Sequence, residues 1–599
     1  MTNVGFSGIH NYSGPPASSS TDLDPRLLLA NAKRALIPEL GLSVHPGPAP
    51  DARYIMGQGH TEEFVTSSMA FIRTSSLLLC FLAQSAVGGS VPPGAVTAQP
   101  TVVLDDATVI GLPNGTTVQY LGLPFAQPPV GDLRLRLPQS VLPYSGTINA
   151  TVFGNQCIQQ TFPSVTLPSN VPAAAGEYAA TFLADATVPT SEDCLNLNVI
   201  VPATATANSK LPVAVWIYGG GFQVGSNIHP GENIVARSIE LGNPIIYVSV
   251  NYRLSAFGFL GGKEVKEAGV ANLGLWDQRE AFLWVQKYIS AFGGDPSKVM
   301  IWGESAGAIS VALHMLYNGD NSEGLFRAAF MESGNAIPTG YVDNDYLQSN
   351  YDGIVSDTGC SNSSDTLQCL REIPASVLKA AMDKTPSLPP EQWLLSSPIA
   401  DIPFVTGNDF DEGTAFAFAT LNITTDEEFL EYLETFYYLN TPPDEVKKIL
   451  ELYPSDPAAG APYNTGDANA YSPQYKRISS WQGDFIEVAP RRLFTQHLSD
   501  KQPVYVYLAN YHQVDGIGAA HGTELFDIYG SGPLQDYLIR FAATLDPNGE
   551  GAATWPRYTA ASPEMLTLND AEPTINITLD TFRSEQMEYL TKLSLADPV

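Results

Sequence analysis

The sequence predicts an α/β fold in which helices flank a large, mostly parallel central sheet. Two strongly apolar runs, 211–218 and 244–250, are typical of strands covered on both faces. Between Trp276 and Ala291 apolar residues recur at helical spacing, and a strand-like run at 299–302 follows. Strands and helices therefore alternate, which indicates a parallel sheet that binds ligands at the carboxyl ends of its strands.

The other predicted elements follow in chain order. We expect residues 101–104 and 117–121 to pair as a small antiparallel hairpin around the turn at 113–115. Residues 195–201 alternate apolar and polar side chains, which predicts a half-buried strand. Further strands are predicted at 402–405 and 503–509.

Composition limits the classes of function. The 599 residues are 44% hydrophobic and 15% charged, which is a globular composition with material for a large core. We expect a single catalytic domain over 100–595. The formal charge of −32 repels nucleic-acid backbones and anionic membranes, so nucleic acid is not an expected partner. After residue 89 we find no apolar run suited to a transmembrane anchor, and the oligomeric state is left open.

The first hundred residues contain a pattern typical of secretion. In 69–89 a positive charge at Arg73 precedes the apolar run 77–83 and a stretch of small residues, the layout of a cleavable secretory signal. Residues 1–68 are rich in Pro, Gly and Ser without sustained periodicity, and we expect them to be disordered. We therefore expect a secreted protein whose natural translation starts at Met69, without residues 1–68. A buried helix of the fold is the alternative for 69–89.

Cysteines and glycosylation triplets agree with export. An even number of cysteines after the signal suits two disulfides in an exported protein. Three pairings are open, and we favour the two shortest loops because they cost the least entropy to close. These join Cys157 to Cys194 and Cys360 to Cys369. Four reduced core thiols are the alternative. The candidate N-glycosylation sites are Asn114, Asn149, Asn362, Asn422 and Asn576, where exposed.

Ser305 is the candidate nucleophile. It lies in the string Gly303-Glu304-Ser305-Ala306-Gly307, between the strand-like run and a helix-compatible run of small residues. The two glycines let the strand and helix backbones approach closely, so a serine between them is strained and its hydroxyl is exposed. The five-residue string alone is weak evidence, and the flanking strand and helix strengthen it.

A glycine run follows the strand predicted at 211–218. The backbone amides of 219–221 can point into one small space because no side chain blocks them. With the amide of Ala306, they would stabilise the oxyanion of an acyl-transfer transition state. A phosphate-binding loop is a competing interpretation, but the run lacks the Lys-Ser/Thr ending of a P-loop. A plain tight turn is the structural alternative.

His521 is the candidate general base. It lies in a loop of small residues, 518–524, after the strand predicted at 503–509. The other histidines that follow the signal are interpreted as structural or surface residues: His229, His314, His497 and His512.

The acid that orients the histidine is expected between Ser305 and His521 in the chain. Glu412 is the best candidate, and Asp409 and Asp411 remain rivals on spacing alone. A solvated turn is the alternative for all three acids.

Several longer strings resemble the type-B carboxylesterase and lipase family, which includes fungal lipases, sterol esterases and acetylcholinesterase. They are EDCLNLNV at 192–199, VWIYGGGF at 215–222, GLWDQREAFLWVQKYISAFGGDP at 274–296 and the GESAG turn. GNDFDEGTAF around Glu412 and AAHGTELFDIYG around His521 resemble the family's acid and histidine motifs. The similarity extends from about residue 100 to the C-terminus.

The resemblance implies an α/β-hydrolase fold and a secreted serine hydrolase of hydrophobic esters, either a carboxylesterase or a triacylglycerol or steryl ester lipase. It implies no metal and no cofactor, and the favoured disulfides match the family's arrangement. The implied site residues are the triad Ser305, Glu412 and His521 and the oxyanion donors Gly220, Gly221 and Ala306. An acyltransferase or a secondary-metabolite esterase is the alternative. A noncatalytic adhesion or binding protein is disfavoured because the triad residues are intact.

The loop from Cys157 to Cys194 resembles the lid loop of fungal lipases in position and length. Four of its residues could share a helical face: Tyr178, Phe182, Leu183 and Ala186. A short amphipathic lid would suit an enzyme that opens at a lipid interface. An inert, disulfide-bound surface loop is the alternative.

Overall fold

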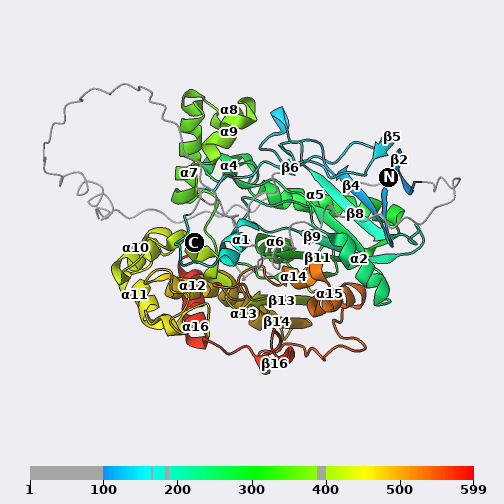
Figure 1. Cartoon of the computed structure of the whole chain (residues 1–599). Coiled ribbons are helices and arrows are strands. Elements are labelled where there is room, and N and C mark those ends of the chain that lie inside the picture. Colours follow the sequence, from blue (N-terminus) through cyan, green and yellow to red (C-terminus); the bar gives the residue numbers. More distant parts are fainter. Residues whose placement is uncertain (1–98, 163–165, 182–187, 387–398, 599) are drawn as a thin grey trace, which may run out of the picture. The chain divides into compact units, whose positions relative to one another are not determined.

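Eleven strands form the central sheet (Figure 1). In spatial order they are β16 (Ile575–Leu579), β15 (Glu564–Asn569), β14 (Val504–Asn510), β13 (Phe404–Asp409), β12 (Ala328–Glu332), β11 (Gly294–Glu304), β9 (Leu211–Ile217), β10 (Ile246–Val250), β8 (Asn196–Pro202), β4 (Thr117–Pro124) and β3 (Leu112–Asn114). All pairs from β15 to β10 are parallel, and the strands at both ends are antiparallel. The predicted mostly parallel α/β sheet is confirmed.

The computed structural model describes residues 99–162, 166–181, 188–386 and 399–598, which lie in a unit that spans Ala95–Val599. The predicted extension, 1–68, and the predicted signal, 69–89, lie outside the described residues.

Helices cover both faces of the central sheet. On one face, α6 (Ala306–Leu316) packs on β11 and β12, and its Ser310 and His314 hydrogen-bond with Gln278 of α5 (Leu273–Tyr288). The other layer holds α2 (Gly231–Glu240), α14 (Leu525–Gly530) and α15 (Pro533–Thr544), which contact one another. On β11, Gly303 lies against α6, whereas Trp302 stacks on Tyr529 of α14. Successive strand residues point to opposite faces, so the two layers lie on opposite sides.

The remaining helices surround these layers. They are α1 (Ala173–Thr181), α3 (Ser255–Gly258), α4 (Lys263–Ala268), α7 (Asp345–Asp357), α8 (Thr366–Glu372), α9 (Ala375–Met382), α10 (Asp426–Phe436), α11 (Pro443–Leu452), α12 (Tyr475–Gly483), α13 (Ala489–Leu498) and α16 (Ser584–Ala596). A second apolar cluster joins residues of α1, α10, α11, α12 and α16. Ile517 and Ala520 belong to this cluster, so it supports the loop that carries His521.

The predicted hairpin between 101–104 and 117–121 is wrong. Residues 101–104 form β1, which turns back at Asp105 and pairs with β2 (Asp106–Ile110) in a separate three-stranded sheet that β5 (Ser145–Asn149) completes. Asp105 has a φ of 46°, a left-handed conformation that Asp tolerates. The turn at 113–115 instead joins β3 to β4. Two short strands, β6 (Gln156–Cys157) and β7 (Thr190–Ser191), pair separately.

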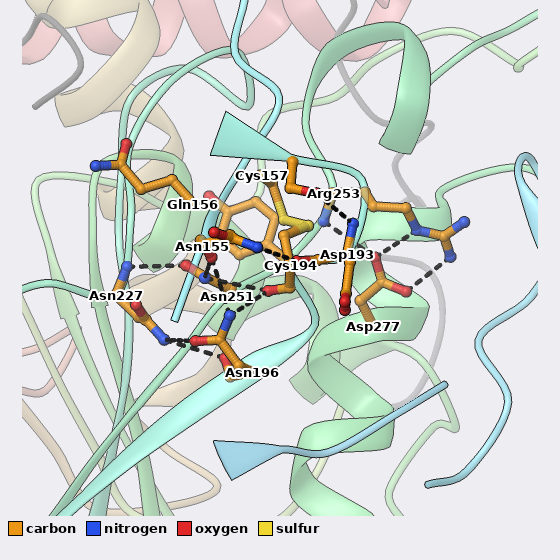
Figure 2. Close-up of a disulfide and its surroundings, with 12 residues drawn as sticks. Asn155, Gln156, Cys157, Asp193, Cys194, Asn196, Asn227, Asn251, Arg253 and Asp277 are labelled. Carbon is orange, nitrogen blue, oxygen red and sulfur yellow. Dashed lines mark hydrogen bonds and ion pairs between the residues drawn. A yellow bond between two sulfur atoms is a disulfide. The ribbon is translucent and has the colours of Figure 1, made fainter. Parts of the chain in front are cut away.

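The strand at 195–201 is not half-buried as predicted, because β8 is buried on both faces. Its polar residues are satisfied by hydrogen bonds inside the protein. Asn196 donates to the carbonyls of Asn155 and Cys194 (Figure 2). Asn198 donates to the carbonyl of Asn227 and to Ser249. The alternating pattern therefore marks a buried amide network rather than a face in water.

Both disulfides form as favoured. Cys157 pairs with Cys194 across 37 residues, and Cys360 pairs with Cys369 across 9 residues. The Cys157–Cys194 bridge lies beside the asparagine network and the buried ion pair of Arg253 with Asp277 (Figure 2).

The predicted helix at 276–291 begins earlier and ends as a tighter turn. α5 runs over Leu273–Tyr288, and a 3-10 turn continues to Phe292 before Gly293, whose φ is 91°. Phe282 and Val285 are buried as their spacing predicts, but Leu283 is 48% exposed. In the described part of the chain, no helix is both long and apolar enough to cross a membrane.

Candidate active site

Ser305 sits in a strained turn between β11 and α6. Its φ of 55° and ψ of −127° lie in a region that non-glycine residues seldom adopt. The turn is possible because a side chain at Gly307 would meet the carbonyl oxygen of Ile217 at 2.0 Å, and one at Gly303 would meet Gly307 at 2.4 Å. The strand and helix are therefore closely packed, and Ser305 is left half-buried at the carboxyl edge of the sheet.

The glycine run lies directly against this turn. A side chain at Gly219 would meet Glu304 at 2.5 Å and the Cβ of Ser305 at 2.8 Å. Gly220 and Gly221 have positive φ of 99° and 61°. Among the described residues, the amides of Gly220, Gly221 and Ala306 donate no hydrogen bond. They are therefore available to an oxygen atom placed beside Ser305.

His521 is buried in the loop before α14, and the two rival acids hold this loop. Asp409 accepts hydrogen bonds from the amides of Gly522 and Thr523 at 2.8 and 3.1 Å. Asp411 accepts from the amides of Ala519 and Tyr463 at 3.1 and 2.7 Å. Both carboxylates are thus occupied by backbone, and neither contacts the imidazole ring.

Glu412 contacts the ring. Its Oε2 lies 2.7 Å from Nδ1 of His521, and its Oε1 accepts hydrogen bonds from Asn408 and from the amide of Asp409. Both partners of this pair are buried, with 2% of each side chain exposed. A charge-assisted hydrogen bond in such a site fixes the orientation of the ring. Of the three acids between 409 and 412, the structure brings Glu412 alone to His521.

Glu304 approaches the other edge of the ring. Its Oε1 lies 3.3 Å from Nε2 of His521, and Nε2 has no hydrogen-bond partner among the described residues. Because Glu304 precedes Ser305, Nε2 faces the elbow turn. Burial by itself lowers the pKa of His521, but the hydrogen bond and charge of Glu412, with Glu487 and Glu304, outweigh it and raise that pKa above its ordinary value.

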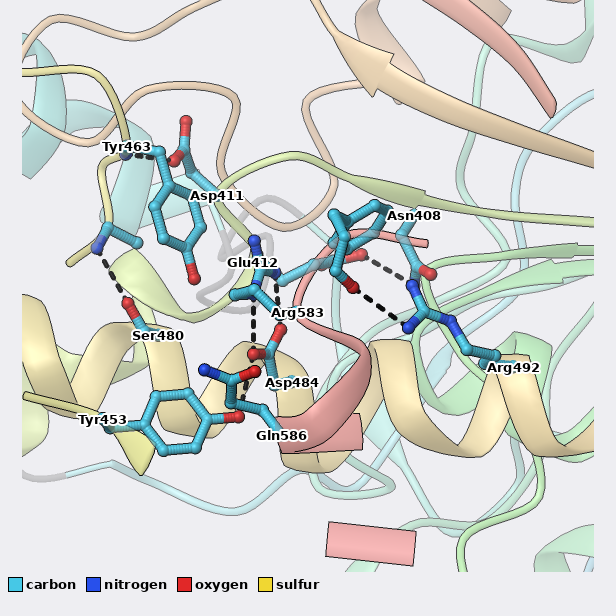
Figure 3. A network of polar contacts seen from close by, with 12 residues as sticks. Asn408, Asp411, Glu412, Tyr453, Tyr463, Ser480, Asp484, Arg492, Arg583 and Gln586 are labelled. Carbon is cyan, nitrogen blue, oxygen red and sulfur yellow. Dashed lines mark hydrogen bonds and ion pairs between the residues drawn. The ribbon is translucent and has the colours of Figure 1, made fainter. Parts of the chain in front are cut away.

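A buried polar network contacts Asn408, a hydrogen-bond partner of Glu412. Arg491 donates to Asn408 at 2.7 Å and pairs with Asp580, which also pairs with Arg492. The neighbouring helical segment is held by Asp484, which accepts hydrogen bonds from Arg583 and Tyr453 (Figure 3). Close contact of this segment with Glu412 needs two glycines, because a side chain at Gly413 would meet the carbonyl of Ser479 at 1.9 Å. The second is Gly483, where a side chain would meet the Cβ of Glu412 at 3.0 Å.

Sequence reasoning missed several buried acids near the histidine. Glu304 is visible in the GESAG string, but its contact with His521 is not. Glu524 accepts a hydrogen bond of 2.7 Å from Ser333, at the carboxyl end of β12. Glu487 comes from a helix, and its Oε1 lies 3.8 Å from Nδ1 of His521. No sequence signal marks Glu487, because a helical position shows its burial by spacing but not the residue it faces.

The four other histidines take no part in this arrangement. His229 is half-buried and His314 is buried, and loss of solvent around each ring lowers the pKa to about 4 and about 3, so both rings are neutral. His497 lies beside Lys501, and His512 lies 3.6 Å from Asp527. Their interpretation as structural or surface residues agrees with these contacts.

The disulfide-bounded loop reaches the histidine through α1. The hydroxyl of Tyr178 donates a hydrogen bond of 2.6 Å to the carbonyl oxygen of His521, and its ring packs on Phe526. Ala175 and Tyr178 form the buried side of this helix. Three residues of the expected lid face lie outside the described residues: Phe182, Leu183 and Ala186.

Comparison with known proteins decides the family. A model of the carboxylesterase family matches residues 98–588. The chain belongs to the carboxylesterase family. Its family and its lipase relatives identify it as a carboxylic ester hydrolase.

Fungal lipases are among the similar members of the carboxylesterase family. Secreted lipase 1 of Botryotinia fuckeliana is 38% identical over 84% of this chain and 94% of its own length. Secreted triacylglycerol lipase LIP1 of Gibberella zeae is 36% identical over 82% of this chain and 90% of its own. Among solved structures, Aspergillus niger EstA is 28% identical with a TM-score of 0.69, and the match covers 84% of this chain and 99% of EstA. The predicted α/β-hydrolase fold is confirmed.

Proposed function

We propose that the protein is a secreted serine esterase of the lipase type, which hydrolyses hydrophobic carboxylic esters through an acyl-enzyme on Ser305. The observation that carries the proposal is the buried hydrogen bond of 2.7 Å between Glu412 and His521. It holds the ring with Nε2, which has no hydrogen-bond partner among the described residues, towards the turn in which Ser305 is strained and half-buried.

The chemistry follows from these positions. Nε2 of His521 takes the proton of the Ser305 hydroxyl as the oxygen attacks the ester carbonyl, and Glu412 stabilises the imidazolium that forms. The imidazolium then protonates the leaving alcohol as the carbonyl–alkoxy bond breaks. Water repeats the sequence on the acyl-enzyme, which releases the acid and restores the serine hydroxyl.

The free amides supply the second requirement, a place for the negative charge of the tetrahedral intermediate. Gly220, Gly221 and Ala306 are the donors in this proposal. Each such donor contributes about 3 to 4 kcal/mol of transition-state stabilisation when removed singly. No metal or organic cofactor has a role in these steps.

Covalent labelling tests the proposal directly. A hydrophobic p-nitrophenyl alkylphosphonate should release one equivalent of p-nitrophenolate and leave its phosphonyl group on the peptide that contains Ser305, as peptide mass mapping would detect. Loss of esterase activity should parallel labelling. Full inactivation with the adduct on another residue, or an active enzyme that never reacts, would refute the assignment of Ser305.

Substrate profiling separates lipase from esterase. The names of the relatives and the contact of α1 with the His521 loop support a lipase. We therefore expect activity on p-nitrophenyl esters to increase from acetate towards long acyl chains, and activity on a triglyceride to rise sharply above its solubility limit. Smooth saturation, confined to short soluble esters, would favour a plain esterase.

The pH profile should respond to Glu304. When ionised, a carboxylate 3.3 Å from Nε2 favours the imidazolium, so it raises the pKa of His521. The neutral ring is the base, so activity increases as pH rises through this pKa. In Glu304→Gln the acid limb of kcat/KM should therefore move to lower pH by about one unit. The exposed Glu431→Gln on α10 is the control, and an unmoved limb in Glu304→Gln would contradict the prediction.

We propose 69–89 as the secretory signal and Met69 as the start of translation. N-terminal sequencing of the secreted protein tests both proposals, and peptides from 1–60 would contradict a start at Met69.

A secreted protein can carry N-glycans at exposed sites. Four candidate sites are exposed: Asn114, Asn149, Asn362 and Asn422. Asn576 is half-buried in β16 and accepts a hydrogen bond from Asn569.

We expect the four exposed asparagines to carry N-glycans and Asn576 to have the lowest occupancy, because the transferase needs an accessible side chain. Enzymatic removal of N-glycans in heavy-oxygen water, followed by peptide mass spectrometry, measures occupancy at each site. High occupancy at Asn576 with unmodified exposed sites would reverse the prediction.

A further inference from the structure

Glu487 is a second carboxyl group on the Nδ1 side of the histidine ring. It lies in a π-helical turn, η8 (Asp484–Val488), that interrupts the helical run from α12 to α13. Such turns are often found at functional sites. Its Oε1 is 3.8 Å from Nδ1 of His521, where Glu412 already accepts at 2.7 Å. The Nδ1 atom therefore faces two carboxyl groups.

A structural role does not account for this residue. Glu487 is 1% exposed, and its Oε2 has no hydrogen-bond partner among the described residues. Within the described part of the chain, its ion-pair contact is with His521. Burying a carboxyl group without partners costs more free energy than burying an apolar side chain of similar size. Glu487 contrasts with Asp484 of the same turn, which is fully paired with Arg583 and Tyr453.

We propose that Glu487 is a positioning residue for His521 that can take the place of Glu412. The two carboxyl groups share one negative charge on the Nδ1 side of the ring. Glu487 accepts the Nδ1–H hydrogen bond when Glu412 cannot. This inference rests on the proposed function. A shift of roughly 1 Å would bring Glu487 from 3.8 Å to the distance of a charge-assisted hydrogen bond.

Electrostatics explains why one carboxyl group is charged at a time. Burial raises the pKa of Glu487 well above its ordinary value, His521 lowers it, and the charges of Glu412, Glu304 and Glu524 raise it further. Glu487 is therefore held neutral beside the hydrogen-bonded pair of Glu412 and His521. The other acids that face this region, Asp409 and Glu332, have pKa values that burial also raises. Loss of the Glu412 charge removes one of the causes that keep Glu487 neutral, so Glu487 can ionise beside the imidazolium.

A double-mutant cycle on kcat/KM for a soluble p-nitrophenyl ester tests the proposal. We expect Glu412→Gln to lower kcat/KM about 10²-fold, Glu487→Gln about threefold, and the double variant about 10⁴-fold, the loss typical of a triad without its acid. The double variant would then fall about 30-fold below the product of the single effects. The residual activity of Glu412→Gln should also gain an acid limb from Glu487 that the double variant lacks.

Glu332 supplies the matched control. It is a buried acid whose two oxygens also have no hydrogen-bond partner among the described residues, and no ion pair joins it to His521 there. Glu332→Gln should combine with Glu412→Gln multiplicatively. Thermal unfolding of each variant checks the fold, and Glu487→Leu, which packs without a carboxyl group, replaces Glu487→Gln if that variant is unstable.

Two results would overturn the proposal. In one, the effects of Glu412→Gln and Glu487→Gln multiply without excess. In the other, the single substitution Glu412→Gln already lowers kcat/KM about 10⁴-fold. Failure of the phosphonate to label Ser305 in the active wild-type enzyme would instead refute the proposed function. Labelling of Ser305 with a multiplicative cycle would refute only the role of Glu487.

Discussion

Replacing Ser305 by alanine is expected to lower kcat/KM for a soluble ester by about 10⁵-fold or more. The methyl group leaves nothing for His521 to deprotonate, so no acyl-enzyme forms. Binding should change little, because the oxyanion donors belong to the backbone. The measurement is initial-rate kinetics, with substrate-analogue binding followed separately.

A matched serine shows that the effect is specific. Ser297 is exposed at the start of β11, the strand that leads to Ser305. Ser297→Ala should retain wild-type kinetics, and Ser305→Ala should retain the wild-type thermal unfolding midpoint. Wild-type turnover by Ser305→Ala would show that another residue is the nucleophile.

Replacing Arg491 by methionine is expected to have the largest effect on stability, a loss of about 3 kcal/mol in the free energy of unfolding. Arg491 and Asp580 are both fully buried, and the paired atoms are 2.5 Å apart. Of the cations that pair with Asp580 in the described part of the chain, methionine would leave Arg492. Asn408, which donates to Glu412, would also lose its donor from Arg491. Activity should therefore fall along with stability. Denaturant unfolding and ester hydrolysis measure the two effects.

A surface ion pair provides the control. Arg237 pairs with Asp536 and Glu240, but 33% of its side chain is exposed, so Arg237→Met should cost only about 0 to 1 kcal/mol. Equal losses in the free energy of unfolding for the two variants would show that the buried ion pair stabilises the fold no more than the surface pair does.

The same network predicts how stability depends on pH. Burial alone would raise the pKa of Asp580, but its pairing with Arg491 and Arg492 lowers that pKa below its ordinary value. The stabilisation is therefore complete above the pKa of the unfolded chain, about 3.9, and is lost as pH falls towards the lower folded value. Arg491→Met should raise the pKa of Asp580 in the folded protein. The free energy of unfolding of this variant should therefore change less between neutral and acidic pH than that of the wild type.

The sequence alone determined the features that depend on chain neighbours. The elbow at Ser305 was predictable because a strand, two glycines and a helix follow one another within a few residues, and their backbones must pack closely. The parallel sheet followed from apolar runs that alternate with helical spacing. The disulfides followed from short loops. The choice of Glu412 came from family resemblance, because spacing alone left Asp409 and Asp411 as close rivals.

Only the tertiary structure decided which acids meet which partners. It showed that Asp409 and Asp411 bind the amides of the histidine loop while Glu412 reaches the ring. It showed that β8 buries its asparagines, and that Glu304 and Glu487 approach His521 from two other elements. The physical reason is that periodicity in a sequence reports whether a side chain is buried but not which residue it meets. The hydrogen-bond partner can come from a segment far away in the chain, as for Glu412 and His521, which are 109 residues apart.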